Sequence, residues 1–239
     1  MLVFDIDDTL YQRSEPYLRA YRELFRERYA LEEEALVKAN HRNKEEQFHL
    51  YSEGKISFEE MTVRRTQNTF RDMGVILSGD EAAHFEQVYS SYQNSLTLHP
   101  AFRDLLDTLL AKGVPMGVLT NGLPDRQRNK LTAMGAEGYF PEEHIMASGD
   151  IGVIKPATEL FRAFEQKVGR GPNQLWMIGD SFESDIAGAR KAGWHAVWLN
   201  RKGEVLPDDT ALHPDLMGRS EEEVCRLVLD SVNRLHAAE

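Results

Sequence analysis

The sequence predicts an α/β protein with a doubly wound parallel sheet and an inserted all-helical subdomain. Two observations predict the sheet: short apolar runs recur along the chain, and amphipathic segments with helical spacing separate them from about residue 100 onward. A third observation predicts the insertion, because residues 14–95 carry successive helix signals and no run typical of a strand. We therefore expect an α/β core of residues 1–13 and 96–239, and a helical cap of residues 14–95.

Five apolar runs fit the buried strands of a parallel sheet. Each run is short, and most are rich in Val, Ile, Leu or Met, as expected when helices cover both faces of a strand. They are Leu2–Phe4, Val114–Leu119, His144–Met146, Leu175–Ile178 and Ala196–Leu199. Only the first run precedes the helical segment, so the cap is expected to interrupt the core between its first two strands.

Helix starts are indicated by capping boxes, in which a Ser side chain and a Glu three residues later bind each other's backbone N–H groups. Such pairs occur at Ser57 and Glu60, Ser78 and Glu81, and Ser220 and Glu223. Another start signal is Ser14 followed by Pro16. Two of the boxes and the Ser-Pro signal fall within the expected cap, which supports an all-helical insertion.

Composition limits the partners that this chain can bind. Its 239 residues include 28 Lys and Arg against 39 Asp and Glu, a net charge of −11, which disfavours binding to a nucleic acid polymer. A small phosphorylated metabolite remains compatible, since one local cation outweighs a distant acidic surface. No apolar run is long enough to span a bilayer, so no membrane partner is expected. The single cysteine, Cys225, fits a reducing compartment, so we expect a cytoplasmic protein. We also expect it to be a monomer or a homodimer.

The first predicted strand runs directly into two aspartates. In extended backbone, side chains two residues apart point the same way, so Asp5 and Asp7 are expected together at the carboxyl end of the strand, where parallel sheets bind ligands. Two converging carboxylates repel each other unless one is protonated or a cation lies between them, and Mg²⁺ suits oxygen ligands of this kind. The alternative interpretation is an Asp-rich turn that begins the next helix.

Two other strand ends carry groups that suit a phosphate. The second strand leads into Thr120, Asn121 and Gly122, which offer a hydroxyl and backbone N–H donors. Lys155 lies in a later loop, where its charge would neutralise a phosphate or a carboxylate, and Pro156 fits the first position of the next helix. Taken alone, each segment has a simpler interpretation, because Thr-Asn-Gly is a common turn and a loop lysine is usually solvated.

The fourth predicted strand ends in Gly-Asp-Ser, with Asp180 in the middle and Asp185 five residues later. Asp180 is positioned to complete a metal site with the aspartate pair, and Asp185 would hold a metal-bound water or Lys155. An ordinary N-cap aspartate is the alternative here. The shared location favours a functional site, because four strand ends would deliver carboxylates, a hydroxyl and a lysine to one edge of the sheet.

In order and spacing, these segments resemble the motifs of the haloacid dehalogenase superfamily of phosphohydrolases, in the subfamily with a helical cap inserted after the first motif. The segments similar to the four motifs are Asp5-Ile6-Asp7-Asp8-Thr9, Thr120, Lys155, and Gly179-Asp180-Ser181 with Asp185. The resemblance covers nearly the whole chain and implies a Rossmann-like core with the cap. The family often has glycine where Asp8 stands, and aspartate there is similar to the branch that contains pyrimidine 5′-nucleotidases.

The resemblance implies a Mg²⁺-dependent phosphatase that works through an aspartyl-phosphate. Asp5 would attack phosphorus, and Asp7 would protonate the leaving alkoxide and then deprotonate the attacking water. Asp5, Asp180 and the backbone carbonyl of Asp7 would hold Mg²⁺, with Asp185 as a further residue of the metal site. The phosphoryl oxygens would be stabilised by Thr120, Asn121 and Lys155.

The expected substrate is a small phosphorylated metabolite, such as a nucleoside 5′-monophosphate. Sugar-phosphate and phosphoglycolate-type phosphatases, and phosphomutases, use the same core and stay open as alternatives. A dehalogenase is disfavoured, since that branch lacks the second aspartate of the first motif, here Asp7. A non-enzymatic phospho-binding module is disfavoured by the helical insert, because a lid serves to shield an intermediate from water.

Two segments outside the motifs are placed to choose among leaving groups. These are the loop Tyr11–Glu15, which leaves the first motif, and the turn Tyr51–Lys55. Gly54 permits a tight bend, and Arg13, Tyr51 and Lys55 offer cations and a ring that would bind a base or sugar. The alternative is that Gly54 only ends a helix and Lys55 is solvated.

Overall fold

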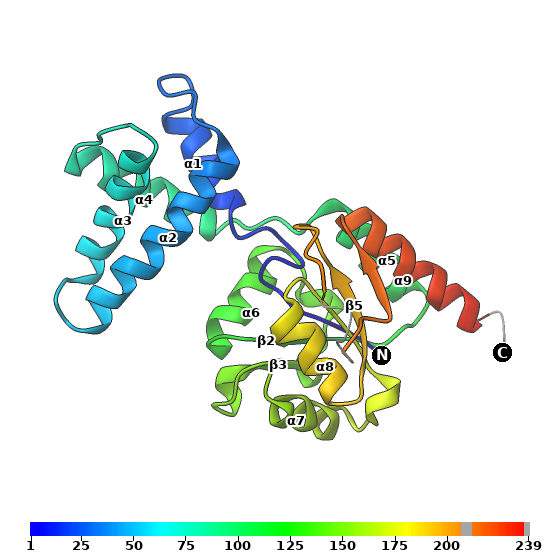
Figure 1. The fold of residues 1–239 in the computed structure, drawn as a ribbon. Coiled ribbons are helices and arrows are strands. Elements are labelled where there is room, and N and C mark those ends of the chain that lie inside the picture. The colour runs from blue at the N-terminus through cyan, green and yellow to red at the C-terminus, as the bar shows by residue number, and fades with distance from the viewer. Residues whose placement is uncertain (207–211, 237–239) are drawn as a thin grey trace. The chain divides into compact units, whose positions relative to one another are not determined.

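The structure is a computed structural model that describes residues 1–206 and 212–236. It divides into two compact units (Figure 1). The core unit consists of Met1–Gln12 and Thr97–Glu239, and the helical unit is Arg13–Leu96. Each boundary differs by one residue from the boundary expected from the sequence.

The core unit is built on one six-stranded sheet in which every pairing is parallel. The strand order is β3-β2-β1-β4-β5-β6. The strands are β1 (Leu2–Phe4), β2 (Met116–Thr120), β3 (Ile145–Ala147), β4 (Trp176–Gly179), β5 (His195–Leu199) and β6 (Leu216–Gly218). This order confirms the predicted doubly wound sheet, because the chain moves outward from β1 in both directions.

Strand β6 is missing from the sequence-based prediction. It is three residues long, it lies at the edge of the sheet, and Met217 in its centre is exposed. A short edge strand of this kind has no buried apolar run, which is the signal that reveals the other five strands.

Helices connect most of these strands, and a last helix follows β6. They are α5 (Pro100–Ala111), α6 (Pro124–Ala133), α7 (Thr158–Val168), α8 (Gly188–Lys191), preceded by a π-helical turn (Phe182–Ala187), and α9 (Glu221–His236). Short 3-10 turns lie at Glu137–Tyr139, Glu142–His144, Ser148–Asp150 and Pro172–Gln174. Helix α7 begins at Thr158, so Pro156 does not occupy its first position as expected, and the Lys155–Pro156 peptide bond is cis.

The alternation of side chains along β1 assigns the helices to two faces of the sheet. Phe4 contacts Phe102 of α5, with the ring centroids 6.2 Å apart. Val3 points to the opposite face, where it packs in a cluster with Leu160 and Phe164 of α7. Helix α9 packs against α5, and α8 packs against α7. Both faces are therefore covered, and every residue of β1 and β2 is buried.

The helical unit contains four helices around an aromatic core. The helices are α1 (Glu15–Leu24), α2 (Glu33–Ser52), α3 (Phe58–Asp72) and α4 (Gly79–Gln93). Rings of Tyr17, Tyr21, Phe25, Phe70 and Phe85 fill the space between them. The two capping boxes predicted within this unit both form, at the starts of α3 and α4. At the start of α9 only half of the box forms, because the Glu223 carboxylate accepts from the N–H of Arg219 instead of Ser220.

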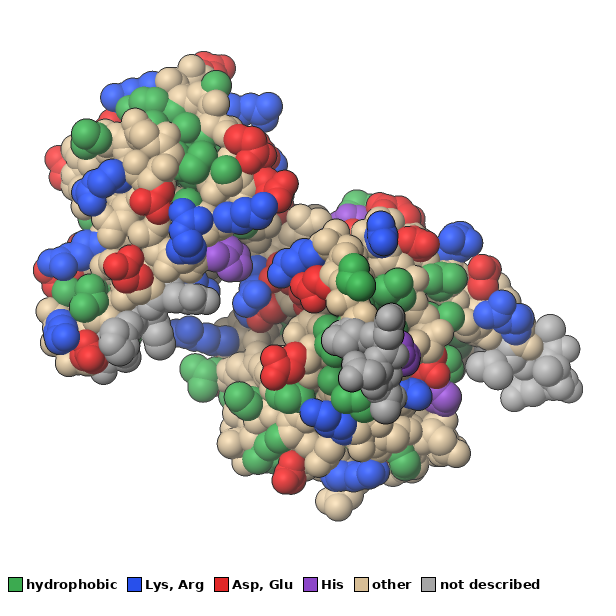
Figure 2. Space-filling view, in the orientation of Figure 1, with side chains coloured by type: hydrophobic (Ala, Val, Ile, Leu, Met, Phe, Trp, Pro, Cys, Tyr) green, Lys and Arg blue, Asp and Glu red, His purple; other side chains and the backbone are tan. Residues whose placement is uncertain are grey.

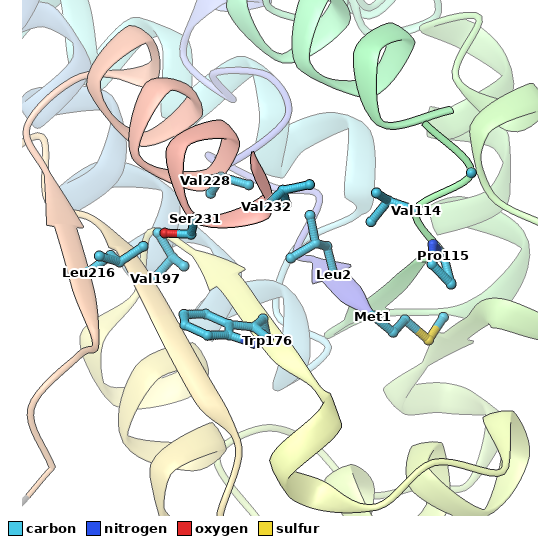
Figure 3. A pocket seen from close by; sticks show the side chains of 11 residues that line it. Met1, Leu2, Val114, Pro115, Trp176, Val197, Leu216, Val228, Ser231 and Val232 are labelled. Atoms are coloured by element: carbon cyan, nitrogen blue, oxygen red, sulfur yellow. The ribbon is translucent and has the colours of Figure 1, made fainter. Parts of the chain in front are cut away.

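An apolar pocket opens at the amino ends of the strands (Figure 3). Leu2, Trp176 and Leu216 reach it from three strands, and Val228 and Val232 reach it from α9. None of its lining side chains is ionisable. This end of the sheet lies opposite the strand ends that carry the predicted site residues.

No helix among the described residues is long and apolar enough to cross a membrane. On the face shown in Figure 2, acidic and basic side chains are interspersed over the surface of each unit. That distribution provides no continuous basic surface on this face for a polyphosphate chain.

Candidate active site

Strand β1 leads directly into Asp5, whose carboxylate is buried at the carboxyl edge of the sheet. The N–H of Asp5 donates to the carbonyl of Ile178 at 2.9 Å, which continues the pairing of β1 with β4. The Nζ atom of Lys155 donates to Asp5 Oδ1 at 2.8 Å. Burial raises the pKa of Asp5 to about 6, because it outweighs the opposing charge of Lys155.

Lys155 uses all three N–H donors of its ammonium group. They bind Asp5 Oδ1 at 2.8 Å, Asp185 Oδ1 at 2.6 Å and the carbonyl of Leu119 at 2.9 Å, and the residue is only 2% exposed. The side-chain amide of Asn121 fixes its backbone, accepting from the N–H at 2.8 Å and donating to the carbonyl at 3.2 Å. Burial lowers the pKa of Lys155, but the charges of Asp185 and Asp5 outweigh it and raise the pKa above its ordinary value.

Asp185 joins the loop after β4 to Lys155. Its Oδ1 atom binds the ammonium group, and its Oδ2 atom accepts from the N–H of Ser181 at 3.0 Å. Gly179 makes room for this carboxylate, since a Cβ atom at Gly179 would lie 2.2 Å from Asp185 Oδ2. The glycine of the Gly-Asp-Ser segment is therefore required by the close approach of Asp185.

Asp5, Asp180 and Asp185 form an acidic cluster, in which one oxygen from each carboxylate lies within 4.8 Å of the others. Burial, together with the charges of Asp185 and Asp5, raises the pKa of Asp180 to about 8. The Asp180 carboxylate accepts no hydrogen bond from any described residue, whereas its backbone carbonyl accepts from Trp198 Nε1 at 2.9 Å. Three carboxylates beside one ammonium leave an excess of negative charge. Hard oxygen donors with this charge fit Mg²⁺.

The Asp7 carboxylate lies outside the acidic cluster and is surrounded by hydrogen-bond donors. Lys130 Nζ binds Asp7 Oδ1 at 2.7 Å and Oδ2 at 2.6 Å. The Tyr11 hydroxyl donates to Oδ1 at 2.5 Å, and Gln127 Nε2 donates to Oδ2 at 3.2 Å. Burial acts to raise the pKa of Asp7, but Lys130 and the other donors lower it below the ordinary value. The sequence predicts that Asp5 and Asp7 point the same way and share a metal. In the structure the Asp7 carboxylate is instead bound by Lys130, Tyr11 and Gln127, apart from the acidic cluster.

Thr120 ends β2 with a hydroxyl that is buried and has no hydrogen-bond partner among the described residues. The same is true of the hydroxyl of Thr9 in the first motif. An unpaired buried hydroxyl costs free energy of folding, so its presence at the strand end favours a role in binding a ligand. Asn121 differs from Thr120, because its side-chain amide is used by the backbone of Lys155.

Asp8 has a φ angle of 60°, the left-handed conformation that favours glycine. Aspartate tolerates this conformation better than most residues. The backbone carbonyl of Asp8 accepts a hydrogen bond from the guanidinium of Arg201. Glu221 binds Arg201 at 2.9 Å and accepts from Gln12 Nε2 at 3.1 Å, so the loop after the first motif is tied to the start of α9.

The three residues expected to select the leaving group belong to the helical unit, not to the unit that carries the acidic cluster. Lys55 pairs with Glu53 at 2.8 Å and its side chain is 62% exposed. The ring of Tyr51 packs edge-on against Phe58, with the centroids 5.9 Å apart. Gly54 has a φ angle of 71°, as a tight bend requires. A role for Arg13, Tyr51 and Lys55 in specificity stays a proposal.

Sequence reasoning missed Lys130, Gln127 and Arg201. Long polar side chains on a helix or loop are usually solvated, so nothing in their type marks them as part of a site. One signal was available: Gln127 and Lys130 are three residues apart on the helix that follows the second motif, so they share one face of it.

The core unit therefore brings a buried carboxylate, an ammonium group, two further carboxylates and an unpaired hydroxyl to one edge of a parallel sheet. The sequence model of the haloacid dehalogenase-like hydrolases matches residues 1–193 of this chain. The chain belongs to the haloacid dehalogenase-like hydrolases. This membership confirms the resemblance drawn from the motifs and the prediction that the chain is an enzyme.

Named relatives of this hydrolase act on phosphate esters. A phosphoserine phosphatase from Thermus thermophilus is 33% identical over 57% of this chain, which spans 53% of that enzyme. An N-acylneuraminate-9-phosphatase from Mus musculus is 29% identical over 84% of this chain and 83% of that enzyme. A pyrimidine 5′-nucleotidase from Streptococcus pneumoniae is 31% identical over 61% of this chain and 60% of that enzyme.

The fold also matches a solved structure, a HAD-hydrolase from Bacillus subtilis bound to magnesium. The two chains are 25% identical with a TM-score of 0.65, over 95% of this chain and 97% of the other. This hydrolase therefore shares the fold of a family member that binds magnesium.

Proposed function

We propose that this hydrolase is a Mg²⁺-dependent phosphomonoesterase that acts through an aspartyl-phosphate on a small phosphorylated metabolite. The observation that carries the proposal is the acidic cluster of Asp5, Asp180 and Asp185, with Lys155 bound to two of its members. The names of the relatives support phosphate esters as the substrate class.

In the first step, the Asp5 carboxylate attacks phosphorus. Lys155 holds Oδ1 of Asp5, which leaves Oδ2 as the attacking atom. The bond between Oδ2 and phosphorus forms while the bond from phosphorus to the substrate oxygen breaks. Asp7, which carries the proton that it took from water in the preceding cycle, transfers this proton to the leaving alkoxide. The unpaired hydroxyl of Thr120 and the charge of Lys155 stabilise the transferring group.

In the second step, water hydrolyses the aspartyl-phosphate. Asp7, now a carboxylate, takes a proton from the water as its oxygen attacks phosphorus. The bond between phosphorus and Asp5 breaks, which restores the Asp5 carboxylate and releases inorganic phosphate. Both steps use Asp7, so its orientation controls the whole cycle.

Mg²⁺, when bound, supplies positive charge that neutralises the transferring phosphoryl group and the carboxylates around it. Asp5, Asp180 and the backbone carbonyl of Asp7 would hold it. Both oxygens of Asp185 are used by Lys155 and Ser181, so Asp185 would support this site mainly by fixing Lys155.

The substrate class we propose is a nucleoside 5′-monophosphate. The nucleotidase among the relatives and the aspartate at Asp8 support this class. The helical unit would select it, with Arg13, Tyr51 and Lys55 contacting the base or sugar. A sugar phosphate is the second candidate, favoured by the relative that is an N-acylneuraminate-9-phosphatase.

Phosphate release from a panel of esters tests this function. The panel contains nucleoside 5′-monophosphates, sugar phosphates, phosphoserine and para-nitrophenyl phosphate. We expect turnover with Mg²⁺, none after chelation with EDTA, and recovery with Mg²⁺ but little with Ca²⁺, which prefers more ligands at longer distances. The proposal would be contradicted if no ester of the panel released phosphate with Mg²⁺ present, or if the full rate remained after chelation.

A further inference from the structure

Helix α6 contributes a lysine and a glutamine to the carboxylate of Asp7, although neither belongs to a motif. Lys130 Nζ contacts both oxygens, at 2.7 and 2.6 Å, and Gln127 Nε2 contacts Oδ2 at 3.2 Å. With the Tyr11 hydroxyl at 2.5 Å from Oδ1, each oxygen accepts two hydrogen bonds. A carboxylate has about four lone-pair sites, so the Asp7 carboxylate is fully occupied.

The backbone around this group is shaped to hold α6 close. Gln127 Nε2 also donates to the carbonyl of Asn121 at 2.6 Å, which links Asp7 to the end of β2. Gly122 has a φ angle of 143°, and a Cβ atom there would lie 2.3 Å from Gln127 Nε2. The glycine of Thr-Asn-Gly thus makes space for a side chain that binds Asp7.

Stability alone does not account for this convergence of donors. The side chains of Lys130 and Asp7 are only 26% and 20% exposed, and the desolvation of such a pair offsets much of its attraction, so its net contribution to the free energy of folding is small. The geometry instead restricts the Asp7 carboxylate to one orientation. Among the described residues of α6, Lys130 alone donates to both oxygens of Asp7. Such control matters because Asp7 must meet the substrate oxygen and then a water.

We infer that Lys130 is a positioning residue that orients the Asp7 carboxylate for proton transfer. The inference rests on the proposed function, in which Asp7 takes a proton from water in the second step. Lys130 would yield one oxygen when Asp7 binds that proton and would keep hold of the other. Without Lys130 each oxygen of Asp7 keeps only one donor, so the carboxylate is held less firmly and hydrolysis of the aspartyl-phosphate slows.

Rapid-mixing kinetics with para-nitrophenyl phosphate separate the two steps, because nitrophenolate leaves without needing a proton. For Lys130→Met with Mg²⁺ we expect a burst of about one nitrophenolate per enzyme, followed by steady turnover about 10-fold or more slower than wild type. Lys130→Arg should recover most of the steady rate, since it also donates to both oxygens. Arg126→Ala, an exposed position on the same helix, is the matched control and should match wild type.

The burst also counts the folded, reactive enzyme, so it distinguishes positioning from structural damage. A steady rate for Lys130→Met within twofold of wild type would overturn the inference, as would loss of the burst together with the steady rate. Wild-type protein that releases no nitrophenolate at all would instead refute the proposed function.

Discussion

Strand β1 connects two contrasting environments, since Leu2 at its start lines the apolar pocket and Asp5, directly after its end, lies in the acidic cluster. At the amino ends of the strands the pocket is lined mainly by apolar side chains, among them Trp176 of β4 and Val228 of α9 (Figure 3). At the carboxyl ends, charged groups are buried against one another. Both environments belong to the same core unit and lie at opposite ends of one sheet.

This difference indicates how stability and chemistry are divided within one sheet. Burial of apolar side chains stabilises the folded state, whereas burial of charges costs desolvation that the ion pairs only partly offset. Asp5 and Asp180 illustrate the cost, because burial raises the pKa of each carboxyl, to about 6 and about 8. Substitutions at the two ends should therefore have opposite consequences for activity and for the free energy of unfolding.

The largest of these effects is expected at the carboxyl end, for Thr120→Val. The change removes an unpaired buried hydroxyl and keeps the side-chain shape. Loss of one donor to the transferring phosphoryl group should lower kcat/KM about 100-fold, while the free energy of unfolding stays equal or rises by up to about 1 kcal/mol. Steady-state kinetics and urea unfolding check the two halves. A stability loss with unchanged kcat/KM would mean that the hydroxyl has a structural role.

At the amino end, Val228→Ala is expected to have the opposite result, a loss of stability with little change in activity. Val228 is buried on α9 and lines the apolar pocket. Removal of its methyl groups should lower the free energy of unfolding by about 2 kcal/mol, because apolar contact is lost and the cavity grows. The kcat/KM for para-nitrophenyl phosphate should stay within twofold of wild type. An activity loss comparable to that of Thr120→Val would show that the two ends are coupled.

The same contrast explains which features the sequence reveals. Buried strands are recognisable in the sequence as apolar runs, and the carboxyl ends of parallel strands lie at one edge of the sheet. The sequence therefore predicts that Asp5, Lys155, Asp180 and Asp185 lie close together. Strand β6 could not be predicted from the sequence, because an exposed edge strand has no such apolar run. The start of α7 also differs from the expected one, since Pro156 fits a helix start as well as the loop that it occupies.

Contacts made by long polar side chains were beyond the sequence argument. The rule that residues two apart share a side predicts one destination for Asp5 and Asp7, but Lys130 and Gln127 of α6 bind the second carboxylate separately. Arg201 binds the carbonyl of Asp8 from a loop that is distant in the sequence. Such contacts depend on tertiary placement, which neither charge nor periodicity encodes.

We propose Asp5 as the nucleophile, and trapping its phosphorylated form is the sharpest test of that role. Wild-type enzyme is quenched in acid during turnover with Mg²⁺, digested, and its peptides are searched by mass spectrometry for an added phosphoryl group that hydroxylamine removes. We predict this group on Asp5, and neither phosphopeptide nor turnover in Asp5→Asn, whose amide cannot replace the carboxylate. A phosphoryl group on another residue, or substantial turnover by pure Asp5→Asn, would exclude Asp5 as the nucleophile.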